Sequence, residues 1–216
     1  MLTGGASGSG NGTVTFSVAS NGAATARTGM IVVAGGGFSR TCTVLQAGMA
    51  NCGKHFPGHG SAATDTHKGL TDITDTWQAS AELMPYETLI SDGIVDMVMV
   101  GHLVNTKIDP EYPASLSKAT ITGMLRNKLG FNGVVISDDL EMGAITAHYN
   151  MDEVVLLAID AGMDILLYGN NISYDPDIAA KVHSTILKLV KAGKISRERL
   201  EESYMRIRAL KKQLNH

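Results

Sequence analysis

The chain has 216 residues, of which 44% are hydrophobic and 18% are charged, a balance typical of a soluble globular protein with one domain or two small ones. Its formal net charge of -3 and the lack of any basic run argue against a nucleic-acid or membrane-surface partner. No apolar run approaches the roughly 20 residues that a membrane-spanning helix needs.

The N-terminal stretch contains neither a basic run nor an apolar run, so the sequence predicts no secretory signal. The chain is then expected to be either cytoplasmic or a fragment of a secreted protein. Its two cysteines, Cys42 and Cys52, cannot build a disulfide framework, but they can form one bridge or remain two free thiols. The compartment therefore stays open.

Residues 1–48 differ from the rest of the chain, because they contain no Lys, Asp or Glu and are rich in small residues. An alternating pattern predicts a strand over residues 13–18, and Asn21-Gly22 follows as a turn signal. Two more strands are predicted over 28–33 and 38–45, joined by a glycine hairpin loop. We expect a short antiparallel β segment, which is small for an independent domain, or alternatively an N-terminal cap.

From residue 49 the pattern changes to strands that alternate with helices, which predicts a parallel α/β sheet with right-handed crossovers over residues 49–216. Ser117 and Ser196 are candidate helix N-caps, and Gly130 and Gly162 are candidate C-caps. Strands are expected over 50–53, 96–100, 133–136 and 164–167. Helices are expected over 80–91, 117–129, 151–161, 176–192 and 196–214.

Polar side chains follow each predicted strand at the point where the strand ends. Because the carboxyl ends of parallel strands meet at one edge of the sheet, we expect these side chains to share a face. The alternative role for Asp138 is to cap the N-terminus of a helix. The alternative for His102 is a core histidine whose ring nitrogens are hydrogen-bonded within the protein. The whole set is Lys54 and His55, His102, Asp138 and Asp139, and Tyr168 and Asn170.

The stretch from Lys54 to His67 carries the densest polar chemistry of the chain. It contains three histidines, a lysine and an aspartate, Asp65, arranged around Lys-His-Phe-Pro-Gly-His-Gly and Asp-Thr-His. Pro57 and the glycines exclude a regular helix. We interpret the stretch as a shaped loop that carries functional groups, the alternative being a surface turn with scattered histidines.

This loop resembles the signature of family 3 glycoside hydrolases, in the branch of the bacterial β-N-acetylglucosaminidases. Further motifs match in the same order, and the resemblance covers about residues 49–214. Residues 8–48 resemble the last strands of a BACON-type immunoglobulin-like module, which in bacteria is often attached to carbohydrate-active enzymes. The further motifs are Glu82-Leu83-Met84-Pro85-Tyr86, Met99-Val100-Gly101-His102, Pro113-Ala114-Ser115-Leu116-Ser117, Leu125-Arg126, the stretch 134–142 and Ala161-Gly162-Met163-Asp164.

The resemblance implies retaining hydrolysis of β-N-acetylglucosaminides, with a small sugar or an oligosaccharide as the substrate. Asp138 would be the nucleophile that forms a covalent glycosyl-enzyme. His67, polarised by Asp65, would be the general acid/base. The family needs no metal or organic cofactor. The residues implied to contact the sugar are Lys54, His55 and His102.

The family's catalytic domain is an eight-stranded (β/α) barrel, and the motif at Lys54 resembles its fifth strand. The sequence is therefore expected to hold half of a TIM barrel, with four parallel strands that cannot close by themselves. Two chains could pair their half-sheets in a two-fold homodimer, or the N-terminal strands could cover the open edge. The missing half of the sugar pocket predicts weak activity.

Two other functions remain open from the residues alone. One is a metal-dependent hydrolase of esters or phosphoesters, in which a divalent ion activates water. The other is a non-catalytic remnant that binds carbohydrate or another partner. It also stays open whether phosphate, in place of water, accepts the sugar from the enzyme. The metal ligands in the first alternative would come from His55, His59, His67, His102 and Asp138.

Overall fold

The computed structural model describes residues 2–4, 15–16, 30–35, 38–43, 50–62, 69–171 and 173–214, and for the first four of these ranges it describes the backbone alone. Two antiparallel pairs occupy the N-terminal part: β1 (Leu2–Gly4) with β2 (Thr15–Phe16), and β3 (Met30–Gly35) with β4 (Phe38–Thr43). The hairpin predicted around residues 35–37 is confirmed by the pairing of β3 with β4. Neither pair extends the parallel sheet through a described ladder.

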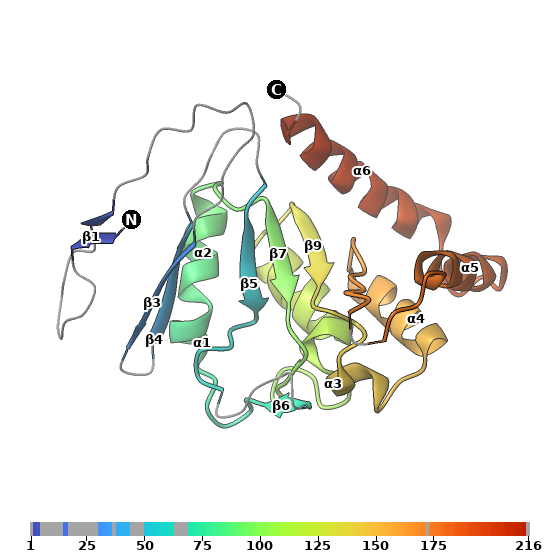
Figure 1. Cartoon of the computed structure of the whole chain (residues 1–216), viewed down its shortest axis with the longest axis horizontal. Helices are drawn as coiled ribbons and strands as arrows, with labels where there is room; N and C mark the ends of the chain where they lie inside the picture. Colours follow the sequence, from blue (N-terminus) through green and yellow to red (C-terminus); the bar gives the residue numbers. More distant parts are fainter. Residues whose placement is uncertain are drawn as a thin grey trace.

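The main sheet is parallel and has the order β5 (Cys52–Phe56), β7 (Met97–Val100) and β9 (Val134–Ser137) (Figure 1). The fourth predicted strand, over 164–167, makes only one parallel bridge, between Ile136 and Ile165. It still runs beside β9, because Ser137 N donates to Ile165 O at 3.0 Å. The predicted α/β fold is confirmed, and its reading as half of a barrel stays a prediction.

The first helical region is divided in two. The sequence predicts one helix over 80–91, but the structure has α1 (Ala79–Glu82) and α2 (Met84–Ser91). Pro85 lies in the first turn of α2, where its missing N–H costs no helix hydrogen bond, so a new helix can begin there. A short parallel pair, β6 (Thr71–Asp72) with β8 (Leu103–Val104), lies below the main sheet in Figure 1.

The later helices follow the predicted positions closely. Ser117 Oγ accepts from Thr120 N at 3.0 Å, as expected of a cap, although the helix that follows is a π-helix preceded by a 3₁₀ turn. Ser196 Oγ caps the last helix by accepting from Arg199 N at 3.1 Å. Gly162, at φ 115°, ends α4 as predicted. The elements are η2 (Ala114–Leu116), η3 (Ala119–Lys128), α3 (Gly143–Thr146), α4 (Met151–Ala161), α5 (Ile178–Lys191) and α6 (Arg197–Leu214).

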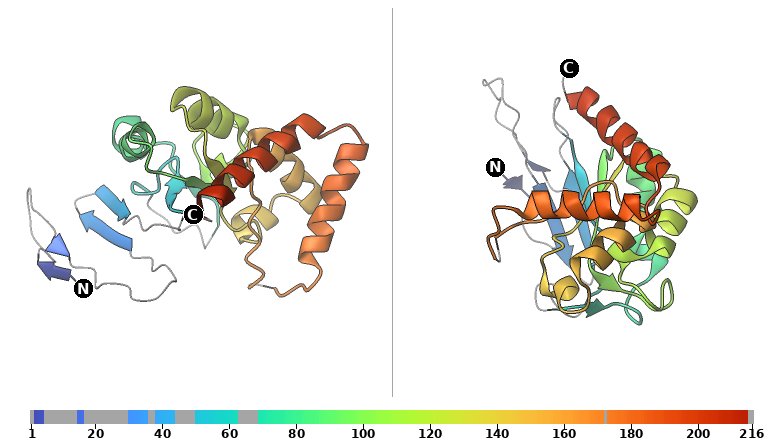
Figure 2. Two further views of the ribbon diagram at one scale, coloured as in Figure 1. Left: turned by 90° about the horizontal axis from the view of Figure 1, so that it is seen from above. Right: turned by 90° about the vertical axis from the view of Figure 1, so that its right-hand side faces the viewer.

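The main core lies between the sheet and the helices that connect its strands. Val98, Val100 and Val135 of the sheet have no exposed surface. They pack against side chains of α2, η3 and α4, and a smaller cluster joins α4 to α5 and to the turn before α6. In Figure 2 the helices α5 and α6 stand on the side of the sheet away from β3 and β4. None of the described helices is long and apolar enough to cross a membrane.

Cys52 carries a free thiol on β5, where burial raises its pKa to about 11. Only the backbone of Cys42 is described, so the predicted alternatives for that cysteine lie outside the described side chains. A protonated, half-buried thiol is a poor nucleophile, so we expect Cys52 to react slowly at neutral pH.

Candidate active site

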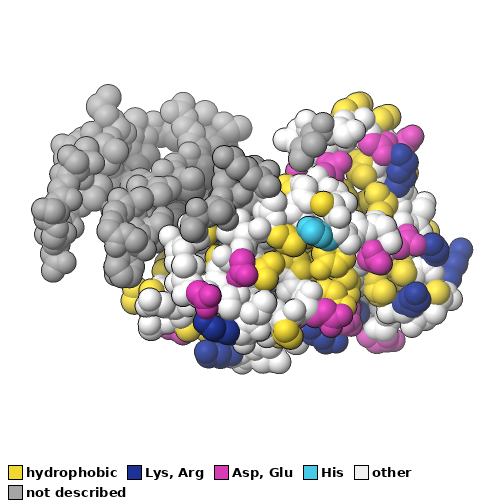
Figure 3. Space-filling model, turned by 90° about the horizontal axis from the view of Figure 1, so that it is seen from below, with side chains coloured by type: hydrophobic (Ala, Val, Ile, Leu, Met, Phe, Trp, Pro, Cys, Tyr) yellow, Lys and Arg dark blue, Asp and Glu magenta, His cyan; other side chains and the backbone are white. Residues whose placement is uncertain are grey.

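Two of the predicted polar groups meet at the carboxyl end of the sheet. His55, at the end of β5, places Nε2 3.5 Å from Oδ2 of Asp138, which follows β9. Their side chains keep 28% and 17% of their surface exposed, so both can be reached from solvent. Figure 3 looks toward this end of the molecule, where hydrophobic side chains gather near the centre with histidine and acidic side chains among them.

Asp138 is fixed by its backbone as well as by its position after a strand. Its N–H donates to Val100 O at 3.0 Å, which continues the pairing of β7 with β9 by one residue. Its Oδ1 accepts from Asp139 N at 2.9 Å, and Oδ2 is left to face His55. Since the next helix, α3, begins only at Gly143, Asp138 is not the N-cap of that helix.

His102 lies beneath the site and does not line it. Its side chain has no exposed surface, and both ring nitrogens have partners: Nε2 is 2.9 Å from Asp139 O, and Nδ1 is 2.7 Å from Ser115 Oγ. A carbonyl oxygen can only accept, so Nε2 carries the proton and Ser115 donates to Nδ1. Burial also lowers the pKa of His102, which keeps the ring neutral. In this arrangement His102 supports the backbone beside Asp138, and its contact with a sugar stays a prediction.

Asp139 joins the end of β9 to the end of the fourth strand. Its Oδ1 accepts from Glu141 N at 3.0 Å and from Gly169 N at 2.9 Å, and Glu141 in turn accepts from Asn170 N. A Cβ at Gly169 would lie 2.3 Å from Asp139 Oδ2, so a larger residue there would force the Asp139 side chain to shift. Asp139 and Asn170 therefore shape the loops around Asp138.

The loop after β5 is braced by residues of the next segment of the chain. Glu82 Oε1 accepts from Ser61 N at 2.9 Å, and Trp77 Nε1 donates to Pro57 O at 2.9 Å. Neither brace follows from the sequence, because a carboxylate in the first turn of a predicted helix usually faces solvent. In the sequence, the only sign that Glu82 has a special role is the motif that begins there.

Gly58 is a residue of this loop at which a side chain would not fit. Its φ is +124°, and a Cβ placed there would lie 2.5 Å from Glu82 Cβ. We expect Gly58→Ala to lower the free energy of unfolding by about 2–4 kcal/mol, through backbone strain and the clash with the brace. Urea unfolding measures the loss. Gly143→Ala, where a Cβ meets nothing within 4 Å, is the matched control, and an equal loss in both variants would contradict this role.

The remaining predicted residues are placed as follows. Lys54 is exposed in the middle of β5, because this strand covers Cys52–Phe56 and does not end at residue 53 as predicted. The His59 ring lies 6.0 Å from the His55 ring. The predicted acid/base His67 and its partner Asp65 fall in residues 63–68, outside the described residues. Among the described residues, no group of three or more His, Cys, Asp or Glu side chains is arranged to hold a metal ion. Tyr168 lies beside the core, where burial raises its pKa to about 12.

The electrostatics of His55 favour a neutral ring. Burial lowers its pKa from 6.5 to about 4, with smaller contributions from Lys54, His59 and His102, while Asp138 opposes the shift. The unfolded chain therefore binds a proton below pH 6.5 that the folded chain does not bind until about pH 4. The contribution of His55 to the free energy of unfolding is therefore fully present above pH 6.5 and is lost as the pH falls toward 4. The lowered pKa of His102 likewise makes the protein less stable as the pH falls.

We expect the free energy of unfolding to fall by about 1–2 kcal/mol between pH 7.5 and pH 5 because of His55 alone. Urea unfolding at the two pH values measures this difference. In His55→Gln the difference becomes smaller, whereas in His183→Gln, a change of an exposed histidine on α5, it stays as in the wild type. A pH dependence that is the same in all three proteins would contradict the assignment.

The chain is similar in sequence and in fold to known glycosidases. It is 39% identical over 128 residues to a β-hexosaminidase of Tolumonas auensis, a match that covers 58% of this chain and 38% of that protein. A family 3 β-N-acetylglucosaminidase from Paenibacillus sp. str. FPU-7 has a TM-score of 0.71 at 36% identity, with 78% of this chain and 32% of that chain covered. Zinc-bound CbsA from Thermotoga neapolitana has a TM-score of 0.66 at 34% identity, covering 76% and 35%.

The chain spans less than half of the length of each of these relatives. The family description that matches is "Glycosyl hydrolase family 3 N terminal domain", over residues 15–210. This range contains the parallel sheet, the loop after β5, Asp138 and the helices that cover them. It begins inside the segment predicted to be BACON-like, so a separate module there is not shown. By this match over most of its length, the chain belongs to glycosyl hydrolase family 3.

Proposed function

We propose that this chain cleaves β-N-acetylglucosaminides by the retaining mechanism, with Asp138 as the nucleophile. The observation that carries the proposal is the placement of the Asp138 carboxylate at the carboxyl end of β9, 3.5 Å from His55, in a chain that belongs to family 3. Hexosaminidases and a β-N-acetylglucosaminidase among its relatives support this substrate class.

The reaction has two steps. Asp138 attacks the anomeric carbon while the bond from that carbon to the leaving oxygen breaks, and His67 gives its proton to that oxygen. His67 then takes a proton from water, whose oxygen displaces the Asp138 carboxylate from the sugar. The roles of His67 and Asp65 rest on the sequence resemblance alone. Lys54 and the neutral His55 ring are proposed to donate hydrogen bonds to sugar hydroxyls.

The activity is tested with p-nitrophenyl β-N-acetylglucosaminide, and with the matching β-glucoside as the control for the acetamido group. We expect slow release of p-nitrophenol from the first substrate and at least about tenfold less from the second. EDTA is expected to change nothing, because no cofactor takes part. Absence of turnover of either sugar would contradict the proposal and leave the chain a non-catalytic member of the family.

Metal-dependent hydrolysis is the second candidate, since one relative was crystallised with zinc bound. In the described arrangement His102 has both nitrogens engaged, and no group of three or more described His, Cys, Asp or Glu side chains is placed to hold an ion. An ion would therefore need His67, outside the described residues, beside His55 and Asp138. Activity on aryl esters or phosphoesters that EDTA abolishes and zinc restores would favour this candidate. Stimulation of glycoside cleavage by phosphate would instead identify phosphate as the acceptor.

We also propose that the sheet is half of a (β/α)8 barrel, completed by a second copy of the chain. In support, β5 ends the described sheet on one side, and the segment at Ile165 makes one bridge on the other, so both edges offer unpaired backbone groups. Light scattering is expected to give about twice the chain mass of 22.8 kDa. A monodisperse monomer would contradict the dimer without bearing on Asp138.

The BACON-like origin of residues 8–48 belongs with these proposals. The antiparallel pairing of β3 with β4 supports it, while the family match from residue 15 weighs against it.

A further inference from the structure

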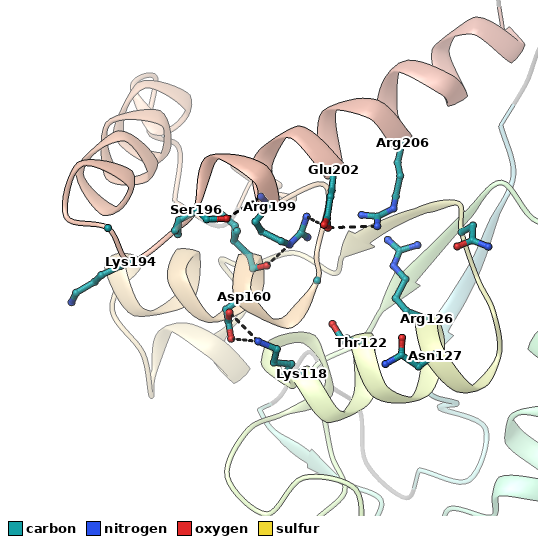
Figure 4. A pocket seen from close by; sticks show the side chains of 15 residues that line it. Lys118, Thr122, Arg126, Asn127, Asp160, Lys194, Ser196, Arg199, Glu202 and Arg206 are labelled. Carbon is teal, nitrogen blue, oxygen red and sulfur yellow. Dashed lines mark hydrogen bonds and ion pairs between the residues drawn. The ribbon is translucent and has the colours of Figure 1, made fainter.

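A polar cavity of about 540 Å³ lies between η3, the end of α4 and the beginning of α6 (Figure 4). It is remote from Asp138, because Arg126 in its wall donates to Gly133 O, just before β9, whereas Asp138 follows that strand. Only Ile159 and Ile195 of its lining are large and apolar. The volume suits a small molecule, and the lining suits a polar one.

The cavity is positively charged although the chain as a whole carries -3. Its lining contains five cations but only two carboxylates, Asp160 and Glu202, and a third carboxylate, Asp164, is buried beneath it. Two positive charges are left over. The Lys118 ammonium is already paired with Asp160 at 3.1 Å, so the excess belongs to Arg126, Lys194, Arg199 and Arg206.

The charge of Asp164 is already included in this balance, and its acceptor sites are full. Oδ1 accepts from Ser203 Oγ at 2.7 Å and from Arg206 Nη1 at 3.0 Å. Oδ2 accepts from Arg126 Nη2 at 2.6 Å and from Val135 N at 3.0 Å. A carboxylate with four donors has no lone pair to offer another cation.

Arg199 makes its hydrogen bonds with neutral groups. It donates to Ile159 O at 2.9 Å, Met163 O at 2.7 Å and Ser203 Oγ at 2.8 Å. The nearest carboxylate oxygens, of Asp164 and Glu202, are 3.7 and 3.9 Å from its guanidinium nitrogens. Its hydrogen bonds therefore hold the guanidinium in place without cancelling its charge.

The cations come from different elements and converge on one space. In Figure 4 the guanidinium of Arg126 rises from η3 toward that of Arg206, which descends from α6. Residues 193–196, just before α6, line the same cavity, and the partial positive charge of the helix N-terminus adds to that of the side chains. Thr122, Asn127 and Ser196 supply neutral polar groups around them.

We propose that this cavity binds a small phosphate-bearing molecule with a hydroxylated body. Guanidinium groups bind phosphate oxygens with paired, charge-assisted hydrogen bonds, and two negative charges match the excess of the cavity. The hydroxyl and amide groups of the lining suit the rest of such a molecule. None of these residues belongs to the proposed glycosidase site, so either proposal can fail without the other.

Isothermal titration calorimetry at low salt tests the site on the whole chain, with inorganic pyrophosphate as the probe. We expect a Kd below about 1 mM, and at least about tenfold weaker binding by Asn127→Asp, which places a carboxylate in the lining and removes no partner. Gln213→Glu makes the same chemical change at an exposed position of α6 outside the lining, and is expected to bind as the wild type does.

Arg206→Gln gives a second test, with circular dichroism to establish that it folds, and is also expected to weaken binding about tenfold or more. Citrate, titrated in parallel, is expected to bind more weakly than pyrophosphate. Absence of pyrophosphate binding by the wild type would overturn the proposal. So would equal binding by Asn127→Asp and Gln213→Glu, or a preference for citrate.

Discussion

Replacing Asp138 by asparagine is expected to lower kcat for p-nitrophenyl β-N-acetylglucosaminide by at least about a thousandfold. The asparagine amide has nearly the shape of the carboxylate and can still accept from Asp139 N, so the fold is expected to remain. The variant lacks the negatively charged oxygen that attacks the anomeric carbon in the first step and is displaced from it in the second. Steady-state rates of the purified variant measure the effect.

Asp139→Asn is the matched control for this change. Asp139 is the adjacent carboxylate, and its Oδ1 accepts from two backbone N–H groups, which an asparagine oxygen can also do. We expect its kcat to stay within about tenfold of the wild type. Equal losses in the two variants, or full activity in Asp138→Asn, would contradict the assignment of the nucleophile.

Asp164→Ala is expected to lower the free energy of unfolding by about 3–5 kcal/mol, the largest effect on stability that we predict for a single residue. The Asp164 side chain has no exposed surface and lies next to three guanidinium groups, from η3 and from two turns of α6. Removing it leaves those cations half-buried without their main counter-charge. Urea or thermal unfolding, with the slope of the transition checked, measures the loss.

Asp160→Ala supplies the comparison, because Asp160 also forms an ion pair with a cation of the same cavity. Its side chain and that of Lys118 are 62% and 63% exposed, and exposed pairs contribute at most about 1 kcal/mol. A small loss for Asp160→Ala beside a large one for Asp164→Ala is the expected result. If the two losses were alike, burial would not explain the importance of Asp164.

Local signals in the sequence predict much of this fold. Residues 151–161 are predicted as a helix, and α4 has the same bounds, because a glycine that can adopt a positive φ ends it. The parallel order of the strands follows from their alternation with helices. The shared position of His55 and Asp138 follows from the rule that the carboxyl ends of parallel strands meet at one edge.

What the sequence does not predict depends on partners far along the chain. Glu82 reaches back 21 residues to Ser61, and Asp164 meets guanidinium groups 35 to 42 positions away. Whether His102 faces the site or the core is decided by Ser115 and by a backbone oxygen beyond β9, which periodicity does not show. The fourth predicted strand makes only one bridge, between Ile136 and Ile165, which its apolar pattern does not predict.

The most direct test of the central claim is to trap the glycosyl-enzyme. The chain is incubated with an activated fluoro analogue of an N-acetylglucosaminide, whose ring fluorine slows the second step, then digested and analysed by mass spectrometry. A mass increase of one sugar on the peptide that contains Asp138, absent from Asp138→Asn, is the predicted result. An adduct on another residue, or none while the substrate is still cleaved, would contradict the proposed role of Asp138.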